Sequence, residues 1–191
     1  MSRRWRGDYL GDTSENVDAN TYRNALSSSK EKIDPKTVLF SAMTVKFNRM
    51  NKANDRAIVF TKDNKIVKMD PAKKYKVMLV IPMSDVTGIS LSPDDGNQLI
   101  LVHLKSSNDL VLSLTSKKNE DLTGEAVGVL CAHFSKMMNR PLPVSVSNEL
   151  KAKSGKKSKV VSVQAAAADT GFAKTADGGI LYSAQSAKNG Y

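Results

Sequence analysis

The stretch Val38–Phe47 reads VLFSAMTVKF and is rich in β-branched, aromatic and other apolar residues. Apolar side chains at Leu39, Met43, Val45 and Phe47 share one face at a period of two, and Lys46 belongs to the opposite face. The stretch therefore predicts a β-strand that ends beside a cation.

Six further strand-like runs follow at close spacing, interrupted by turn signals such as Asp63-Asn64 and Asp70-Pro71. They cover residues 56–61, 65–69, 75–82, 86–91, 98–104 and 109–114. Seven short strands in a row are typical of a small barrel or sandwich. The sequence thus predicts a mainly β fold.

A single long helix is predicted after the seventh strand. Its apolar stripe recurs at steps of three and four from Leu122 to Met137, and Asn139-Arg140-Pro141 ends it. A stripe on one side predicts that the helix caps an open end of the barrel. A short polar helix is predicted at 21–32, before the first strand.

The remainder of the chain predicts an extra β-hairpin. Strands are expected at 144–148 and 159–164, joined by a lysine-rich loop, with a last edge strand at 180–183. The expected organisation is a segment at 1–20, a core with an N-terminal helix at 21–140, and a C-terminal β extension at 141–191.

The composition predicts a folded basic domain that has neither a disulfide framework nor a membrane-spanning segment. The chain has 191 residues, 40% hydrophobic residues and a net charge of +10, which predict a folded domain with an anionic partner. Its single cysteine, Cys131, cannot form a disulfide framework, so we expect a reducing compartment. There is no apolar run of 18 residues and the start is too polar for a signal peptide, so any membrane attachment is expected to be peripheral.

The positive charge is concentrated in two places. The segment from Thr44 to Lys76 contains ten basic and three acidic residues. Its net charge is therefore +7, out of +10 for the whole chain. A second cluster comprises Lys151, Lys153, Lys156, Lys157 and Lys159. Focused positive charge is expected of a surface that binds anions.

The first cluster predicts a cationic rim. Lys46 ends the first strand and Arg56 begins the second, so they flank one loop, which also contains Arg49 and Lys52. Alternate turns of a meander lie at the same end, which adds the turn with Lys73 and Lys74. Six such cations at an anionic bilayer would contribute on the order of 5 kcal/mol.

A structural role remains open for both clusters. Loop lysines also keep strand edges from pairing with other chains, and this interpretation is as well supported by the pattern as an anion site. For the second cluster, at a hairpin tip with Ser154-Gly155, a solvated tip is the more common situation and a second membrane contact the alternative.

The order of several short motifs resembles the tail homology 1 domain of class I myosins over nearly the whole chain. The resemblance rests on RWRGDYL at 4–10, VLFS at 38–41, KFNR at 46–49, NDRAIVFT at 54–61, MDPAKKYKVM at 69–78 and GEAVGVL at 124–130. The first of these is similar to the segment that follows the last light-chain-binding motif of the myosin neck, which makes 1–20 a post-neck segment.

The resemblance implies a pleckstrin-homology-like fold and binding of phosphatidylinositol bisphosphate, phosphatidylserine and other anionic phospholipids. It implies headgroup contacts by Lys46 and Arg56, with Arg49 and Lys52 as neighbours. Lys105, in the loop between the sixth and seventh strands, is added by the resemblance alone. The motif is more widely spaced here than in the tightest lipid-binding members, which favours membrane binding over selection of one headgroup.

The same resemblance implies a place in a larger protein. The parent would be an unconventional myosin I, an actin-activated ATPase motor with a calmodulin-like light chain on its neck. The chain would link this motor of the actin cytoskeleton to the cytosolic face of the plasma membrane or of endomembranes, in the actin-rich cortex. The motor's phosphate-binding motif G-x-x-x-x-G-K does not occur in this sequence.

The sequence also bears on three other classes of function. An enzyme is disfavoured because the two histidines, His103 and His133, have no catalytic partner in the sequence pattern, and neither a metal site nor a cofactor is expected. Nucleic-acid binding is disfavoured because aromatic residues are only 6% and offer no stacking platform. A protein-binding adaptor, whose free strand edge takes up a peptide, is the remaining alternative.

Overall fold

The computed structural model describes residues 5–47, 53–93, 98–114, 121–166 and 171–185. These residues form two compact units, and each is described by itself. The described residues of the first unit fall within 1–44, 55–84 and 124–141, and those of the second within 45–54, 85–123 and 142–191. Strands β1 and β2 contribute residues to both units.

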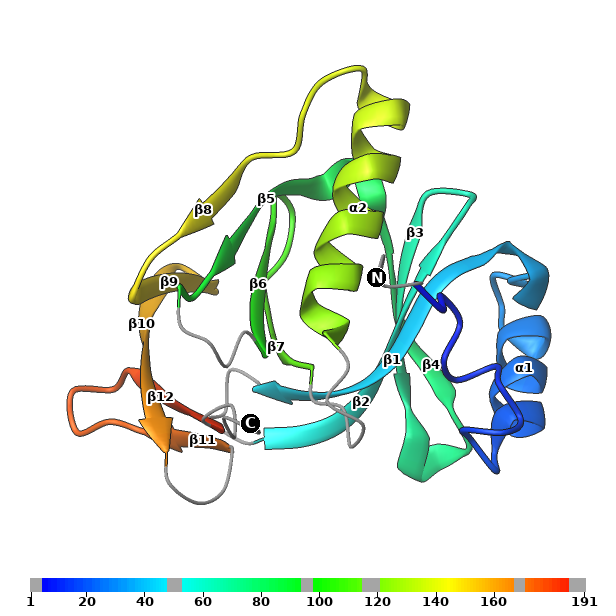
Figure 1. Cartoon of the computed structure of the whole chain (residues 1–191), viewed down its shortest axis with the longest axis horizontal. Helices are drawn as coiled ribbons and strands as arrows, with labels where there is room; N and C mark the ends of the chain where they lie inside the picture. The colour runs from blue at the N-terminus through cyan, green and yellow to red at the C-terminus, as the bar shows by residue number, and fades with distance from the viewer. Residues whose placement is uncertain (1–4, 48–52, 94–97, 115–120, 167–170, 186–191) are drawn as a thin grey trace, which may run out of the picture. The chain divides into compact units, whose positions relative to one another are not determined.

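The first unit is a four-stranded meander with two α-helices (Figure 1). The strand order is β4-β3-β2-β1, and β2–β3 and β3–β4 are antiparallel pairs. Its elements are α1 (Ala19–Ser28), the 3₁₀ turn η1 (Pro35–Thr37), β1 (Val38–Phe47), β2 (Ala53–Thr61), β3 (Lys65–Asp70), the 3₁₀ turn η2 (Pro71–Lys73), β4 (Lys76–Pro82), the 3₁₀ turn η3 (Met83–Asp85) and α2 (Leu122–Met138).

One apolar cluster holds α1 against the meander. Tyr22 and Leu26 are one helical turn apart on the same face of α1, and both are fully buried. They pack in one cluster with Val59 and Val67 of β2 and β3, and Leu10 of the N-terminal segment belongs to the same cluster. Tyr22 also meets Tyr75 edge to face, with 5.7 Å between ring centroids.

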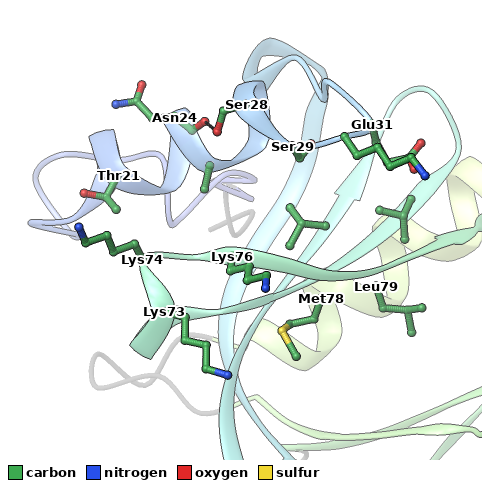
Figure 2. A pocket seen from close by; sticks show the side chains of 14 residues that line it. Thr21, Asn24, Ser28, Ser29, Glu31, Lys73, Lys74, Lys76, Met78 and Leu79 are labelled. Carbon is green, nitrogen blue, oxygen red and sulfur yellow. Dashed lines mark hydrogen bonds between the residues drawn. The ribbon is translucent and has the colours of Figure 1, made fainter.

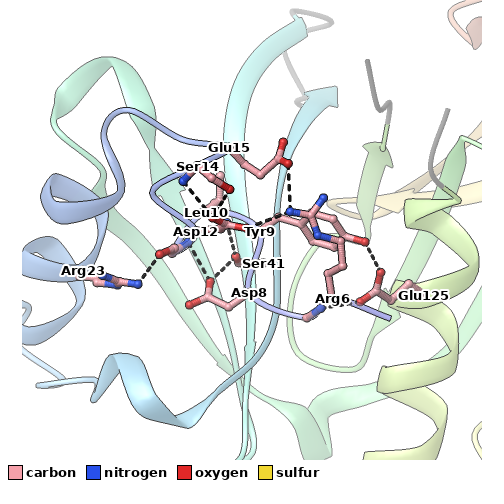
Figure 3. Close-up of polar contacts among 12 residues, drawn as sticks. Arg6, Asp8, Tyr9, Leu10, Asp12, Ser14, Glu15, Arg23, Ser41 and Glu125 are labelled. Atoms are coloured by element: carbon pink, nitrogen blue, oxygen red, sulfur yellow. Dashed lines mark hydrogen bonds and ion pairs between the residues drawn. The ribbon is translucent and has the colours of Figure 1, made fainter. Parts of the chain in front are cut away.

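Polar contacts attach the N-terminal segment to the same unit (Figure 3). The carboxyl group of Glu125 on α2 accepts hydrogen bonds from the Gly7 backbone N–H at 2.7 Å and from the Tyr9 hydroxyl at 2.5 Å. Asp8 accepts hydrogen bonds from the hydroxyl groups of Ser41 and Tyr22. Residues 5–12 are therefore fixed to α2, β1 and α1 within this unit.

The α2 helix buries most of the predicted stripe, with Val129 and Met137 half-buried. Leu122, Ala126, Leu130 and Phe134 are all nearly or fully inaccessible to solvent. Gly128 gives room for the Trp5 indole, because a Cβ atom there would overlap the ring. Burial raises the pKa of the neighbouring Cys131 thiol, as expected of an unreactive structural cysteine.

The second unit consists of two sheets with a common apolar core. One sheet has the order β1-β7-β6-β5-β8 and the other β11-β12-β10-β9. Leu101 and Val111 of the first sheet share a cluster with Leu150, Val161 and Tyr182 of the second. The strands are β5 (Val86–Leu91), β6 (Leu99–Leu104), β7 (Leu110–Ser113), β8 (Val144–Val146), β9 (Glu149–Ser154), β10 (Lys157–Ala166), β11 (Gly171–Lys174) and β12 (Ile180–Gln185).

The structure confirms the mainly β prediction, with seven strands followed by one helix, a helix before the first strand and a β-hairpin near the end. A closed barrel is not formed by the described strands, because β4 and β8 each end a run of paired strands. The division at residues 20 and 140 stays a prediction.

The C-terminal strands differ in detail from the prediction. The strand predicted at 144–148 is shorter and pairs in parallel with β5. The hairpin is formed instead by β9 and β10, with its turn at Gly155-Lys156. β9 was not predicted because lysines alternate with its apolar residues, of which only Leu150 and Ala152 point into the core.

Candidate functional site

In the second unit, cations from β1 and from the β9–β10 hairpin lie together. Lys46 stands opposite Leu112 of β7, in the short stretch where β1 pairs with that strand. Lys46, Lys153 and Lys159 line one small hollow of about 40 Å³. A space of this size holds roughly one water molecule, so an anionic headgroup would meet these lysines at the surface.

Lys105 lies against the same hairpin. The Lys153 ammonium group donates hydrogen bonds to the carbonyl oxygens of Leu104 at 2.5 Å and of Lys105 at 3.2 Å. The Asn108 side chain accepts a hydrogen bond from the Gly155 backbone N–H at the hairpin turn. The β6–β7 loop and the hairpin tip are thus joined, and they bring Lys105 to the second lysine cluster.

The five predicted lysines of the hairpin have different surroundings. Cross-strand pairing places Lys159 opposite the buried Ala152, whereas Lys153 lies opposite Ser158 on the other face. Lys151, Lys156 and Lys157 are exposed. Because Lys153 caps two carbonyl groups, its role is partly structural.

Asp109 fixes the hairpin in place. Its carboxylate accepts hydrogen bonds from the backbone N–H groups of Leu104 and Lys153, at 3.1 and 2.8 Å, and contacts Nδ1 of His103 at 2.8 Å. Burial alone would raise the pKa of Asp109, but the hydrogen bonds from His103, Lys153 and Leu104 outweigh it and hold the pKa below its usual value.

His103 has partners that the sequence pattern did not reveal. Because the Asp109 carboxylate can only accept, Nδ1 of His103 donates to it, and Nε2 lies 2.6 Å from the Ser90 hydroxyl. Ser90 is buried, and its hydroxyl also contacts Ser145 at 2.9 Å. Ser90 of β5 is thus enclosed between His103 of β6 and Ser145 of β8, and these polar contacts join the three strands.

Arg56 belongs to the first unit and faces an acid. Its guanidinium group lies 3.6 Å from the Asp70 carboxyl group at the end of β3, and Asp70 also accepts the Ala72 backbone N–H. The Asp70 side chain is only 7% exposed and that of Arg56 19%. The positive charge of Arg56 is therefore largely balanced within the protein.

We expect Arg56→Ala to lower the free energy of unfolding by about 1–2 kcal/mol, because it leaves the buried Asp70 without its cation. Urea denaturation measures this change, and Arg56→Lys is the matched control because it keeps the charge. Unchanged stability in Arg56→Ala would contradict the ion pair. Because the substitution also removes an internal ion pair, an Arg56 variant alone does not report on lipid binding.

The other predicted cations do not all belong to one unit. Lys73 and Lys74 are exposed at η2, next to Asp70 in the first unit. Lys46 belongs to the second unit, so the single rim expected from the sequence combines residues of both units. Arg49 and Lys52 lie outside the described residues, and their role stays a prediction.

Within the described ranges, no helix is long and apolar enough to cross a membrane. In the same ranges, no group of three or more histidine, cysteine, aspartate or glutamate side chains is placed to hold a metal ion.

A mainly β domain with exposed basic loops and a C-terminal helix is the class of protein that the fold and these surfaces define. The family model described as unconventional myosin tail, actin- and lipid-binding, matches residues 1–182. The chain belongs to this family, the tail homology 1 domains of unconventional myosins.

Curated relatives agree with this family. Human unconventional myosin-Id is 39% identical over 167 residues, covering 86% of this chain and 16% of the relative. Unconventional myosin ID of Drosophila melanogaster is 35% identical over 175 residues, covering 87% of this chain and 17% of the relative. The chain thus spans about one sixth of the length of these relatives.

Solved structures with a similar fold share little sequence with this chain. The hSac2 domain of human phosphoinositide phosphatase Sac2 is 12% identical with a TM-score of 0.43, covering 64% of this chain and 81% of that one. The pleckstrin-homology domain of human TBC1 domain family member 2 is also 12% identical, with a TM-score of 0.42, covering 53% and 85%.

Proposed function

We infer that this tail domain binds phosphoinositides and other anionic phospholipids through the basic surface of its second unit. The observation that carries the proposal is the gathering of Lys46, Lys105 and the lysines of the β9–β10 hairpin around the β6–β7 loop. In this assignment Lys46, Lys159 and Lys105 contact the headgroup. Lys151, Lys156 and Lys157 contact neighbouring lipids, and Lys153 holds the loop in position.

The charges of the hairpin support this assignment. Residues 149–160 contain five lysines and one acid, Glu149. Each lysine near an anionic bilayer contributes roughly 1 kcal/mol, so the hairpin and Lys46 together supply a binding energy of several kcal/mol. This attraction is long-ranged and screened by salt, whereas direct hydrogen bonds to phosphate add a part that is less sensitive to salt.

Arg56, Lys73 and Lys74 of the first unit are kept as weaker proposed contacts, with Arg49 and Lys52. Arg56 is the weakest of these because of its ion pair with Asp70. We further propose that the parent protein is a class I myosin whose actin-activated motor and calmodulin-like light chain lie outside this chain. The tail would then link the motor to the cytosolic face of a membrane.

Sedimentation with vesicles tests the proposal. We expect binding to vesicles with phosphatidylinositol bisphosphate, weaker binding to phosphatidylserine vesicles of matched charge, and none to neutral vesicles. Raising the salt from about 0.1 M to about 1 M shortens the Debye length from roughly 10 Å to 3 Å and should remove the phosphatidylserine binding first. Equal binding to neutral and anionic vesicles would refute the proposal.

A further inference from the structure

The first unit contains a groove between α1 and β4, of which the lipid proposal uses only Lys73 and Lys74, as weaker contacts at one end. It has a volume of about 890 Å³. In Figure 2 α1 runs along one side of it and β4 along the other, with Lys74 near one end and Glu31 near the other. The helix side is polar, with Thr21, Asn24 and Ser28.

The opposite side of the groove is an edge strand. β4 ends the order of paired strands in this unit, so the described strands pair with it only through β3. An edge strand presents backbone N–H and C=O groups that can accept one more strand. A partner in extended conformation can therefore bind there through main-chain hydrogen bonds.

An irregularity in β4 exposes two adjacent apolar side chains. The register between β3 and β4 shifts after the Lys68–Leu79 pair, because the next pair is Met69–Val77 and Met78 is the extra residue. Such a bulge turns consecutive side chains toward the same face. Met78 and Leu79 are accordingly 43% and 38% exposed, and both line the groove.

The charge of the groove selects an acidic partner. Three lysines, Lys73, Lys74 and Lys76, line the end where β4 begins. At the other end Lys30 stands next to Glu31, the one acid of the lining. A segment with acidic residues at one end and apolar residues at the other complements both the lysines and the pair Met78 and Leu79.

We propose that the groove between α1 and β4 binds an acidic segment of a partner protein in extended conformation, as an additional strand beside β4. The acidic residues of the segment face Lys73, Lys74 and Lys76, and its apolar side chains cover Met78 and Leu79. The site is independent of the proposed lipid surface of the second unit.

Amide chemical-shift changes on titration with synthetic peptides test this inference. The probes are Ser-Val-Thr-Leu-Ser-Glu-Glu-Glu, its reversed sequence, and both with lysine in place of glutamate. We expect an acidic peptide in one of the two directions to shift the amides of Lys76–Val80 and α1, and the lysine versions to leave them unchanged. Failure of both acidic peptides at millimolar concentration would overturn the inference.

Variants separate this site from other uses of the same surface. Lys73→Glu with Lys76→Glu, and Met78→Ser with Leu79→Ser, should each weaken the peptide at least tenfold. Lys151→Glu with Lys157→Glu is the matched control, which should weaken vesicle binding and leave the peptide unaffected. If the Met78 and Leu79 variant instead loses vesicle binding, the groove binds a bilayer and the inference is wrong. If the parent chain is a dimer in sedimentation velocity and this variant is a monomer, the groove binds a second copy, and the inference is equally wrong.

Discussion

Replacing Lys46 and Lys159 together by alanine is expected to weaken binding to vesicles with phosphatidylinositol bisphosphate about thirtyfold. Both side chains line the same hollow of the second unit, one from β1 and one from β10. Each contributes roughly 1 kcal/mol at an anionic surface, and a loss of about 2 kcal/mol corresponds to this factor. Vesicle sedimentation over a range of lipid concentrations measures the change.

The control must remove the same charge from another surface. Lys36→Ala with Lys136→Ala does so, because both lysines are exposed in the first unit and neither lines the hollow. We expect less than a threefold change for this control, because neither lysine belongs to the lipid surface proposed for the second unit. Equal losses in the two variants would show that net charge alone drives binding, and the site assignment would then be wrong.

Asp109→Ala is expected to have the largest effect on stability, on the order of 3 kcal/mol. The substitution leaves the buried backbone N–H groups of Leu104 and Lys153 without an acceptor and removes the partner of His103. For a chain of this length the melting temperature should fall by about 6–12 °C. Thermal unfolding followed by circular dichroism measures the change.

The same carboxylate makes stability depend on acid. The pKa of Asp109 is lower in the folded protein than its unfolded value of about 3.9. Its contribution is therefore fully present well above that pH and is lost as the pH falls from about 4 through the folded pKa. The stability difference between the parent and Asp109→Ala should shrink over this acidic range.

Asn108→Ala provides the comparison for Asp109. Asn108 also bonds to the hairpin, at Gly155, but its side chain is exposed and can be replaced by water. We expect a loss below about 1 kcal/mol. If Asp109→Ala were no more destabilising than Asn108→Ala, the carboxylate would not hold the hairpin as inferred.

The strands and the long helix could be predicted because their signals are local. The run Val38–Phe47 was predicted with its observed bounds, and the stripe from Leu122 to Met137 lies within α2. Alternation of period two and recurrence at three and four residues need only neighbouring positions. β9 and β11 were missed, since lysines interrupt one and the other lies in a stretch rich in alanine and glycine.

The cation site was only partly predictable because it depends on which strands pair. The sequence identified the candidate cations and correctly placed Gly155 at a hairpin turn. It could not show that Arg56 faces Asp70, or that Lys153 holds the β6–β7 loop. These contacts join residues 14 and 49 positions apart, and no local pattern specifies them.

The sequence by itself determined that this chain is a mainly β, strongly basic tail domain of an unconventional myosin, because periodicity, charge and family motifs are properties of the chain as written. Only the tertiary structure decided that Lys46 and the hairpin lysines share a surface and that Met78 and Leu79 are turned outward. The physical reason is that strand pairing and its register set the direction of each side chain, and one extra residue in β4 is enough to change it.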